Sequence, residues 1–134
     1  MGDDAQRALQ RLRDHTVLVV EDEAVIAMHL EDILTSGGVR VVGPAPRVAR
    51  ARELLHRSRP DLALLDVNLG GEKVFPFAED LAAAGIPFAF ATGYGQAGLP
   101  AIWQLRPVIH KPFTQPEVFR GLLQALEGPA VSSA

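Results

Sequence analysis

Residues 62–71 read LALLDVNLGG, which opens with an apolar run that ends in a carboxylate. Four apolar residues run directly into Asp66, and Asn68 and two glycines follow closely. A run without polar alternation predicts a strand that is buried on both faces, where an ionised carboxylate is costly unless something compensates it. Asp66 is therefore either an ordinary loop residue, since Asp is common in turns, or the centre of a site.

Similar apolar runs alternate with helical patterns along the rest of the chain. The predicted strands are 16–20, 39–43, 62–66, 86–92 and 107–111, and the predicted helices are 24–36, 47–58, about 74–84 and one beginning after Thr114. We expect Pro44 and Pro46 to end the second strand, and segment 93–105 to hold at most a short helix. Strands that alternate with helices predict a doubly wound α/β fold, with a five-stranded parallel sheet and helices on both faces.

The last helix has the clearest boundaries. Thr114 and Glu117 have the spacing of a capping box, and Gly128 followed by Pro129 ends the helix. Its predicted apolar stripe consists of Val118, Phe119, Leu122, Leu123 and Leu126.

The chain divides into a domain over 15–127 with short segments on either side. In residues 1–14, Leu9 and Leu12 are the only apolar residues larger than alanine after the first Met. We therefore expect a loosely held N-terminal arm, which could be helical. Residues 128–134 form a short C-terminal tail.

Composition excludes several classes of site and location. The 134 residues are 48% hydrophobic and 22% charged, as is ordinary for one globular domain. The absence of cysteine excludes disulfides, thiolate metal sites and cysteine nucleophiles. The net charge of −3 gives no reason to expect nucleic-acid binding. No apolar run suits a membrane span or a signal peptide, so we expect a cytoplasmic protein.

Polar side chains stand where the predicted strands end. In open α/β sheets, ligands bind beyond the carboxyl ends of the strands. The residues at these ends are Glu21, Asp22 and Glu23 for the first predicted strand, Asp66 and Asn68 for the third strand, Thr92 for the fourth and Lys111 for the fifth. Glu23 is better explained as the opening of helix 24–36, where its negative charge suits the helix N-terminus. The others are predicted to converge on one edge of the sheet.

These residue types favour phosphoryl chemistry at a divalent cation. Clustered carboxylates repel one another and need protons or a cation, and oxygen ligands without His or Cys suit Mg²⁺, with Mn²⁺ as a substitute. Lys111 could supply a positive charge to a phosphoryl oxygen, and Thr92 could donate its hydroxyl. Asp66 would be the nucleophile, since carboxylates can form aspartyl-phosphates.

Four motifs in this order resemble the response-regulator receiver domain of two-component signalling. They are VLVVEDE (17–23), LLDVNLGG (64–71), FATG (90–93) and HKPF (110–113). The resemblance covers roughly residues 15–127. It implies a flavodoxin-like sheet of order 2-1-3-4-5 and a cis bond between Lys111 and Pro112.

The resemblance also implies a role for each residue of the site. Asp66 is expected to be the phosphorylation site, and Thr92 and Lys111 to engage the phosphoryl group. Asp22 would bind Mg²⁺ directly, Glu21 mainly through water, and Asn68 through its backbone carbonyl, with Asp66 completing the metal ligands.

The stretch PFAFATGY (87–94) resembles a narrower subgroup of mostly alphaproteobacterial receivers. Members often lack an output domain and pair with histidine kinases of the HWE or a related type. Typical receivers carry a switch aromatic three residues before the lysine, and Val108 stands there in this chain. Tyr94 is our candidate substitute, and the alternative is that Tyr94 is an exposed loop residue.

The best-supported function is a single-domain response regulator. It would accept a phosphoryl group from a histidine kinase and signal through protein–protein contacts, or act as a phosphate sink. It would catalyse only its own phosphorylation and dephosphorylation, and would not be a turnover enzyme. Only GPAVSSA follows the last helix, so we expect no output domain, although a fragment of a longer regulator remains an alternative. The downstream protein is unknown, and a homodimer remains open.

Two other functions remain as alternatives. One is a pseudo-receiver, a scaffold that is never phosphorylated. The other is a phosphohydrolase of the haloacid-dehalogenase type with an aspartyl intermediate. That chemistry needs a second Asp where Asn68 stands, and an amide cannot shuttle protons.

Overall fold

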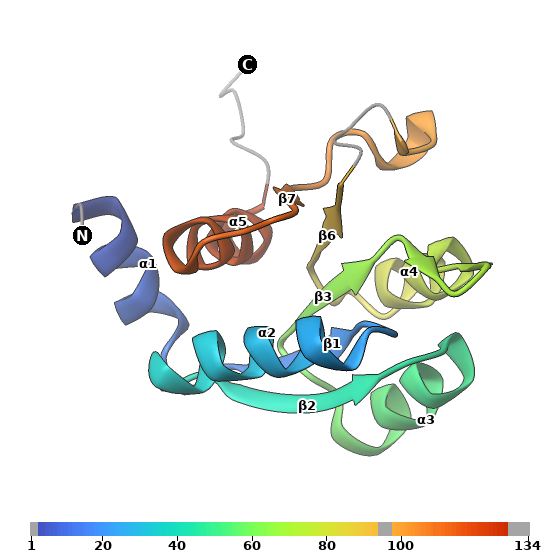
Figure 1. Cartoon of the computed structure of the whole chain (residues 1–134), viewed down its shortest axis with the longest axis horizontal. Helices are drawn as coiled ribbons and strands as arrows, with labels where there is room; N and C mark the ends of the chain where they lie inside the picture. The colour runs from blue at the N-terminus through green and yellow to red at the C-terminus, as the bar shows by residue number, and fades with distance from the viewer. Residues whose placement is uncertain (1–2, 94–97, 129–134) are drawn as a thin grey trace.

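The computed structural model describes residues 3–93 and 98–128, and it has the predicted fold (Figure 1). The five strands of the main sheet are all parallel, in the order β2-β1-β3-β6-β7. They are β1 (Thr16–Val20), β2 (Arg40–Ala45), β3 (Leu62–Asp66), β6 (Phe88–Thr92) and β7 (Val108–His110). The helices are α1 (Asp3–Leu12), α2 (Ala24–Ser36), α3 (Val48–Ser58), α4 (Phe75–Ala83), α5 (Gln115–Glu127) and the short 3₁₀ helix η2 (Ala101–Trp103). The fold class and the strand order expected from the resemblance are confirmed.

The sheet has a separate apolar core on each face. Alternate residues of a strand point to opposite faces, so in β6 Phe88 and Phe90 point to one face and Ala89 and Ala91 to the other. The phenylalanines pack with α3, α4 and η2, whose Trp103 is buried. The alanines pack with α1, α2 and α5. Helices therefore cover both faces, which explains why the strands read as continuous apolar runs.

The second strand extends further than predicted. β2 runs through Pro44 to Ala45 instead of ending at the proline, and the Gly43–Pro44 peptide bond is cis. A proline is tolerated here because β2 is an edge strand, where a residue without an N–H costs no ladder bond on the solvent side. β6 and β7 are shorter than predicted. Each begins just after a proline, Pro87 or Pro107, whose carbonyl accepts a hydrogen bond from the neighbouring strand.

A small hairpin, absent from the sequence prediction, follows β3. Its strands are β4 (Asn68–Leu69) and β5 (Glu72–Lys73), which pair antiparallel. The turn between them consists of Gly70 and Gly71, both with positive φ, a conformation that suits a two-residue hairpin turn. Strands of two residues are too short to produce a periodic pattern, so only the glycine pair could have indicated the hairpin.

The N-terminal segment is held more firmly than predicted. Residues Asp3–Leu12 form α1, which packs against α5 (Figure 1). Ala8 and Leu12 are completely buried, and Arg11 forms an ion pair with Glu127 at 2.7 Å. The expectation of a loosely held arm was wrong because it counted large apolar residues and overlooked Ala8, which lets the helix approach closely.

The last helix begins as predicted. Thr114 and Glu117 form the capping box of α5, with both reciprocal hydrogen bonds present. Gly121 lies on its buried face, where an added Cβ would clash with Ile109 of β7. Among the described residues, no helix is long and apolar enough to cross a membrane.

Candidate functional site

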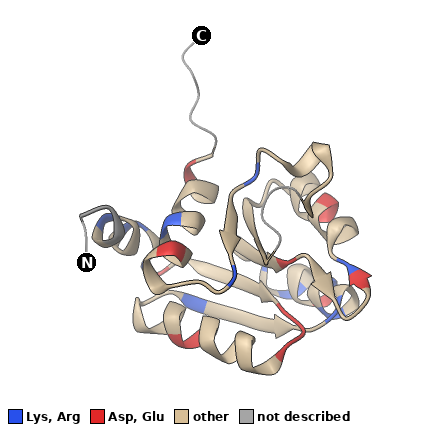
Figure 2. Ribbon diagram, turned by 45° about the horizontal axis from the view of Figure 1, so that its top comes forward, with Lys and Arg blue, Asp and Glu red and all other residues tan. Residues whose placement is uncertain are grey.

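The carboxyl ends of four strands bring the predicted polar residues to one edge of the sheet. The parallel register places Val20 beside Leu65, Asp66 beside Ala91, and Thr92 beside His110. The strands β1, β3, β6 and β7 therefore end next to one another at this edge. The acidic stretch 21–23 lies between β1 and α2, as Figure 2 shows in red.

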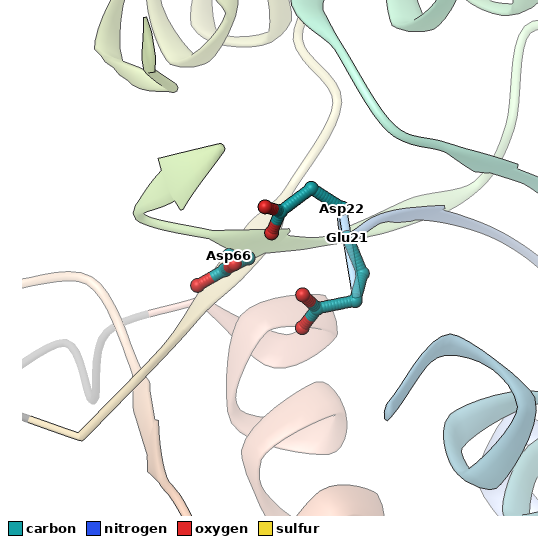
Figure 3. Close-up of side chains that lie close together, drawn as sticks. All are labelled: Glu21, Asp22 and Asp66. Carbon is teal, nitrogen blue, oxygen red and sulfur yellow. The ribbon is translucent and has the colours of Figure 1, made fainter. Parts of the chain in front are cut away.

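Three carboxylates lie together at this edge. Glu21, Asp22 and Asp66 each offer an oxygen, and these oxygens lie within 4.8 Å of one another (Figure 3). Glu21 is 2% exposed and Asp66 7% exposed, whereas Asp22 is half-buried. This donor set consists only of carboxylate oxygens, which suits a hard divalent cation such as Mg²⁺.

Lys111 is the cation of this cluster. Its Nζ donates to Glu21 Oε1 and to Asp66 Oδ1, both at 3.1 Å. Its backbone N–H donates to the carbonyl of Thr92 at 3.0 Å, and the Lys111–Pro112 bond is cis, as the resemblance implied. Lys111 is thus fixed beside β6 and directed at the ends of β1 and β3.

Burial raises the pKa values of the two buried carboxyl groups, Glu21 and Asp66. Burial raises the pKa of Glu21 to about 7, and the charge of Asp66 adds to this, while the Glu23 N–H and Lys111 oppose it. Burial likewise raises the pKa of Asp66, although the charge of Lys111 opposes it. Burial alone would lower the pKa of Lys111, but its bonds and charge interactions with Glu21 and Asp66 raise it instead.

Asn68 comes two residues after Asp66, in the first strand of the hairpin. Its side-chain Oδ1 accepts a hydrogen bond from Gly71 N at 3.2 Å, so the amide is used to stabilise the turn. Val74 N donates to Val67 O at 3.1 Å, which makes these two residues a hydrogen-bonded pair. Such pairs alternate along an antiparallel ladder, so the next pair, Asn68 and Lys73, is not hydrogen-bonded. The backbone carbonyl of Asn68 therefore turns away from β5.

The chain matches the family of response regulator receiver domains over residues 17–122. It belongs to this family. The receiver domain matches the Transcriptional regulatory protein PdtaR of Mycobacterium tuberculosis with 34% identity over 97 residues, which covers 72% of this chain and 45% of that protein. It matches the Phyllosphere-induced regulator PhyR of Methylorubrum extorquens with 32% identity over 133 residues, covering 92% of this chain and 48% of PhyR. The chain thus spans about half the length of the curated relatives it matches.

Solved structures of receiver domains have the same fold. The solution structure of SdrG from Sphingomonas melonis is 45% identical, with a TM-score of 0.75, and the match covers 85% of this chain and 97% of SdrG. The receiver domain of PhyR from Erythrobacter litoralis is 30% identical with a TM-score of 0.75, covering 92% of this chain and 98% of that domain. The chain is therefore a response-regulator receiver domain in sequence and in fold.

The structure brings together most of the residues predicted for the site. Glu21, Asp22, Asp66 and Lys111 form one cluster, and Thr92 is buried at the end of the adjacent β6. Glu23 lies outside the cluster, at the N-cap of α2, as the sequence analysis favoured.

Two further positions concern the predicted switch. Tyr94, the proposed switch residue, lies outside the described residues. Val108, which occupies the usual aromatic position, packs partly buried against the core of the α3–α4 face, in register with Phe90. Phe90 in turn packs edge-on against Phe75 and Phe88 and near Trp103, so Val108 lies next to a group of aromatic rings.

One contact near the site was missed by sequence reasoning. Glu72 of the hairpin accepts a hydrogen bond at Oε1 from Val48 N, the first residue of α3, at 3.1 Å. The two residues are far apart in the chain and belong to no common motif, so no sequence signal could have paired them.

Proposed function

We propose that this receiver domain accepts a phosphoryl group on Asp66 from a histidine kinase and signals through protein–protein contacts, or drains phosphate from that kinase. The observation that carries the proposal is the contact of Lys111 Nζ with both Asp66 and Glu21, at the edge where Asp22 adds a third carboxylate. A purely structural ion pair would need one carboxylate for one ammonium. Here the carboxylates are in excess, which favours a site that receives further positive charge.

The cation that fits this excess is Mg²⁺, with Mn²⁺ as a substitute. Three ionised carboxylates and one ammonium carry a formal charge of −2, which one divalent ion would neutralise. Glu21, Asp22 and Asp66 would hold the ion, with the backbone carbonyl of Asn68, whose orientation away from β5 supports this role. Bound Mg²⁺ would supply positive charge to the oxygens of the transferring phosphoryl group.

The transfer itself requires one bond to form and one to break. An oxygen of Asp66 attacks the phosphorus of the phosphohistidine, the N–P bond breaks, and its electron pair returns to the imidazole nitrogen, which takes up a proton. Lys111 Nζ, already bound to Asp66, can stabilise the negative charge on a phosphoryl oxygen, and Thr92 can donate its hydroxyl. Hydrolysis of the aspartyl-phosphate by water later restores Asp66. The domain is changed and restored by this cycle and does not turn over a separate substrate.

The partner that supplies the phosphoryl group is expected to be a histidine kinase. The PFAFATGY stretch, through the receiver subgroup that it resembles, supports a kinase of the HWE or a related type. The receiving partner downstream would be a protein, because no feature of composition favours nucleic acid. Beryllofluoride binding distinguishes this proposal from the alternative of a pseudo-receiver scaffold that is never phosphorylated.

Beryllofluoride binding tests the proposal directly. With Mg²⁺ present, the wild-type protein should bind this phosphoryl analogue saturably, and Asp66→Ala should abolish binding. The matched control is Asp61→Asn, at the residue just before β3, where the carboxylate instead accepts from Thr16 N. This variant should bind as the wild type does.

Transfer of labelled phosphate then tests the donor. Purified kinases with phosphorylated histidine should label the wild type and the Asp61→Asn variant but not Asp66→Ala. Absence of beryllofluoride binding to the wild type would favour the scaffold, and turnover of an unrelated phosphoester would favour a phosphohydrolase.

A further inference from the structure

Helix α3 begins without a cap of its own. The N-cap residue, Arg47, makes no side-chain hydrogen bond to the first turn. Instead, the backbone N–H of Val48 donates to Glu72 Oε1 at 3.1 Å. The first amides of a helix lack partners within it, and a carboxylate there is favoured also by the helix dipole. Glu72 thus caps α3 from a different part of the chain.

Glu72 belongs to the hairpin that continues directly from the phosphoacceptor strand. It pairs with Leu69, and the turn between them is Gly70 and Gly71. A second contact joins the same two segments, because a Cβ placed on Gly70 would lie 3.1 Å from the guanidinium of Arg47. The turn of the hairpin and the start of α3 therefore pack against each other.

The hairpin has one firmly held side and one exposed side. Leu69 and Val74 are completely buried and anchor it to the core. Asn68, Glu72 and Lys73 are exposed, so the core does not hold this side. On this side, the bond from Val48 to Glu72 and the packing of Arg47 against Gly70 tie the hairpin to the start of α3, and the bond to Glu72 is the directional contact of the two.

We infer that Glu72 is a positioning residue for the phosphoacceptor site. By tying the hairpin to α3, it fixes the orientation of the Asn68 backbone, whose carbonyl is a ligand in the proposed function on which this inference rests. Glu72 itself is not a member of the carboxylate cluster that would hold the cation. Partners that orient a ligand without touching the metal typically contribute 10- to 100-fold to metal affinity, roughly.

The Mg²⁺ affinity of Glu72 variants tests this role. Glu72→Ala should weaken Mg²⁺ binding by about tenfold, measured by calorimetry, and weaken beryllofluoride binding with it. Glu72→Gln keeps the Oε1 acceptor and should stay close to the wild type. The matched control, Glu53→Ala, removes a glutamate of α3 that pairs with exposed Arg50, and should leave Mg²⁺ affinity unchanged.

A second variant separates positioning from simple loss of stability. Arg47 has the extended backbone of an N-cap (φ −144°, ψ 160°), so Arg47→Ser can cap α3 locally. In the double variant Arg47→Ser/Glu72→Ala, the free energy of unfolding should recover while Mg²⁺ affinity stays low, because the hairpin is still untied. The single Arg47→Ser variant serves as the reference.

The outcomes distinguish this inference from the proposed function. If Mg²⁺ affinity recovers together with stability in the double variant, Glu72 acts only as a helix cap and the inference is overturned. The same holds if Glu72→Ala binds Mg²⁺ like the wild type. If the wild type itself binds neither Mg²⁺ nor beryllofluoride, the proposed function fails first.

Discussion

The ion pairs at the carboxyl edge of the sheet differ from those on the helical surface in burial more than in distance. Arg52 and Asp80 join α3 to α4 at 2.6 Å, with 48% and 38% of their side chains exposed. Lys111 lies at 3.1 Å from both Glu21 and Asp66, and the Glu21 side chain is only 1% exposed. Water screens the shorter pair, so that pair contributes little, whereas the longer contacts act in a medium of lower dielectric constant.

The two regions also differ in charge balance. In the surface ion pairs Arg11–Glu127, Arg50–Glu53 and Arg52–Asp80, one positive charge meets one negative charge. At the buried site, one ammonium serves two buried carboxylates, and the raised pKa values of both carboxyls reflect the cost of keeping them ionised. We therefore expect the site to lower the free energy of unfolding of the metal-free protein at neutral pH, as is common where a protein keeps charges for function.

Removal of the ammonium should have the largest effect on stability. At pH 8 without divalent cations, Lys111→Met should lower the free energy of unfolding by about 3 kcal/mol, because two buried carboxylates lose their counter-charge. Urea denaturation followed by the fluorescence of Trp103, the single tryptophan, measures this. Lys73→Met, at the exposed lysine of the hairpin, is the control and should change stability far less. Equal effects of the two substitutions would contradict the comparison.

The pH dependence of stability should show the burial of Glu21. Its pKa is about 7 in the folded protein and near 4.5 when unfolded, so the folded state binds more protons between these values. In EDTA, the free energy of unfolding should therefore fall as pH rises from 4.5 to 7, by on the order of 2 kcal/mol. Asp66 acts in the same direction. The pKa of Glu117 is lowered instead, so the ionised Glu117 stabilises the folded protein. This stabilisation is lost only as the pH falls below the ordinary value of 4.5, outside this window.

The reference for that measurement is Glu21→Gln, which lacks the titrating group. Urea midpoints at several pH values should show a much smaller decline in the variant than in the wild type. Parallel curves for the two proteins would mean that groups other than Glu21 cause the decline.

The same variant should be more stable than the wild type. At pH 8 without Mg²⁺, Glu21→Gln should raise the free energy of unfolding by about 1–2 kcal/mol, because Lys111 keeps Asp66 as a partner and one buried charge is removed. The gain should shrink when Mg²⁺ is added, since the ion stabilises the wild type by mass action. A loss of stability in the variant would show that Glu21 is needed for the fold itself.

The surface pair should have the smallest effect. Asp80→Asn should change the free energy of unfolding by less than about 1 kcal/mol, despite its short contact with Arg52, and the change should vanish in high salt. Denaturation at low and high ionic strength measures this. A loss as large as that of Lys111→Met would refute the view that burial, and not distance, distinguishes the two regions.

Local patterns predicted the fold well where the signal lies within a few neighbouring residues. The apolar runs predicted the parallel sheet, and Thr114 with Glu117 predicted the start of α5. Predictions failed where the structure of a segment depends on its position in the sheet or on the elements that pack against it. Pro44 continues β2 because that strand is at an edge, and α1 is held because Ala8 and Leu12 meet α5.

The candidate site shows the same division. Sequence reasoning selected Glu21, Asp22, Asp66 and Lys111 because each follows an apolar strand, and strands of a parallel sheet share a carboxyl edge. It did not find Glu72, whose partner Val48 lies in another segment and is a backbone amide without any signature in sequence.

Periodicity and strand ends are local properties of the chain, so the elements and the edge at which the polar residues meet can be found from the order of the residues alone. The sharing of Lys111 by two buried carboxylates and the capping of α3 by the hairpin are visible only in the folded protein. Those features depend on desolvation and on hydrogen bonds between distant segments, which exist only once the chain has packed.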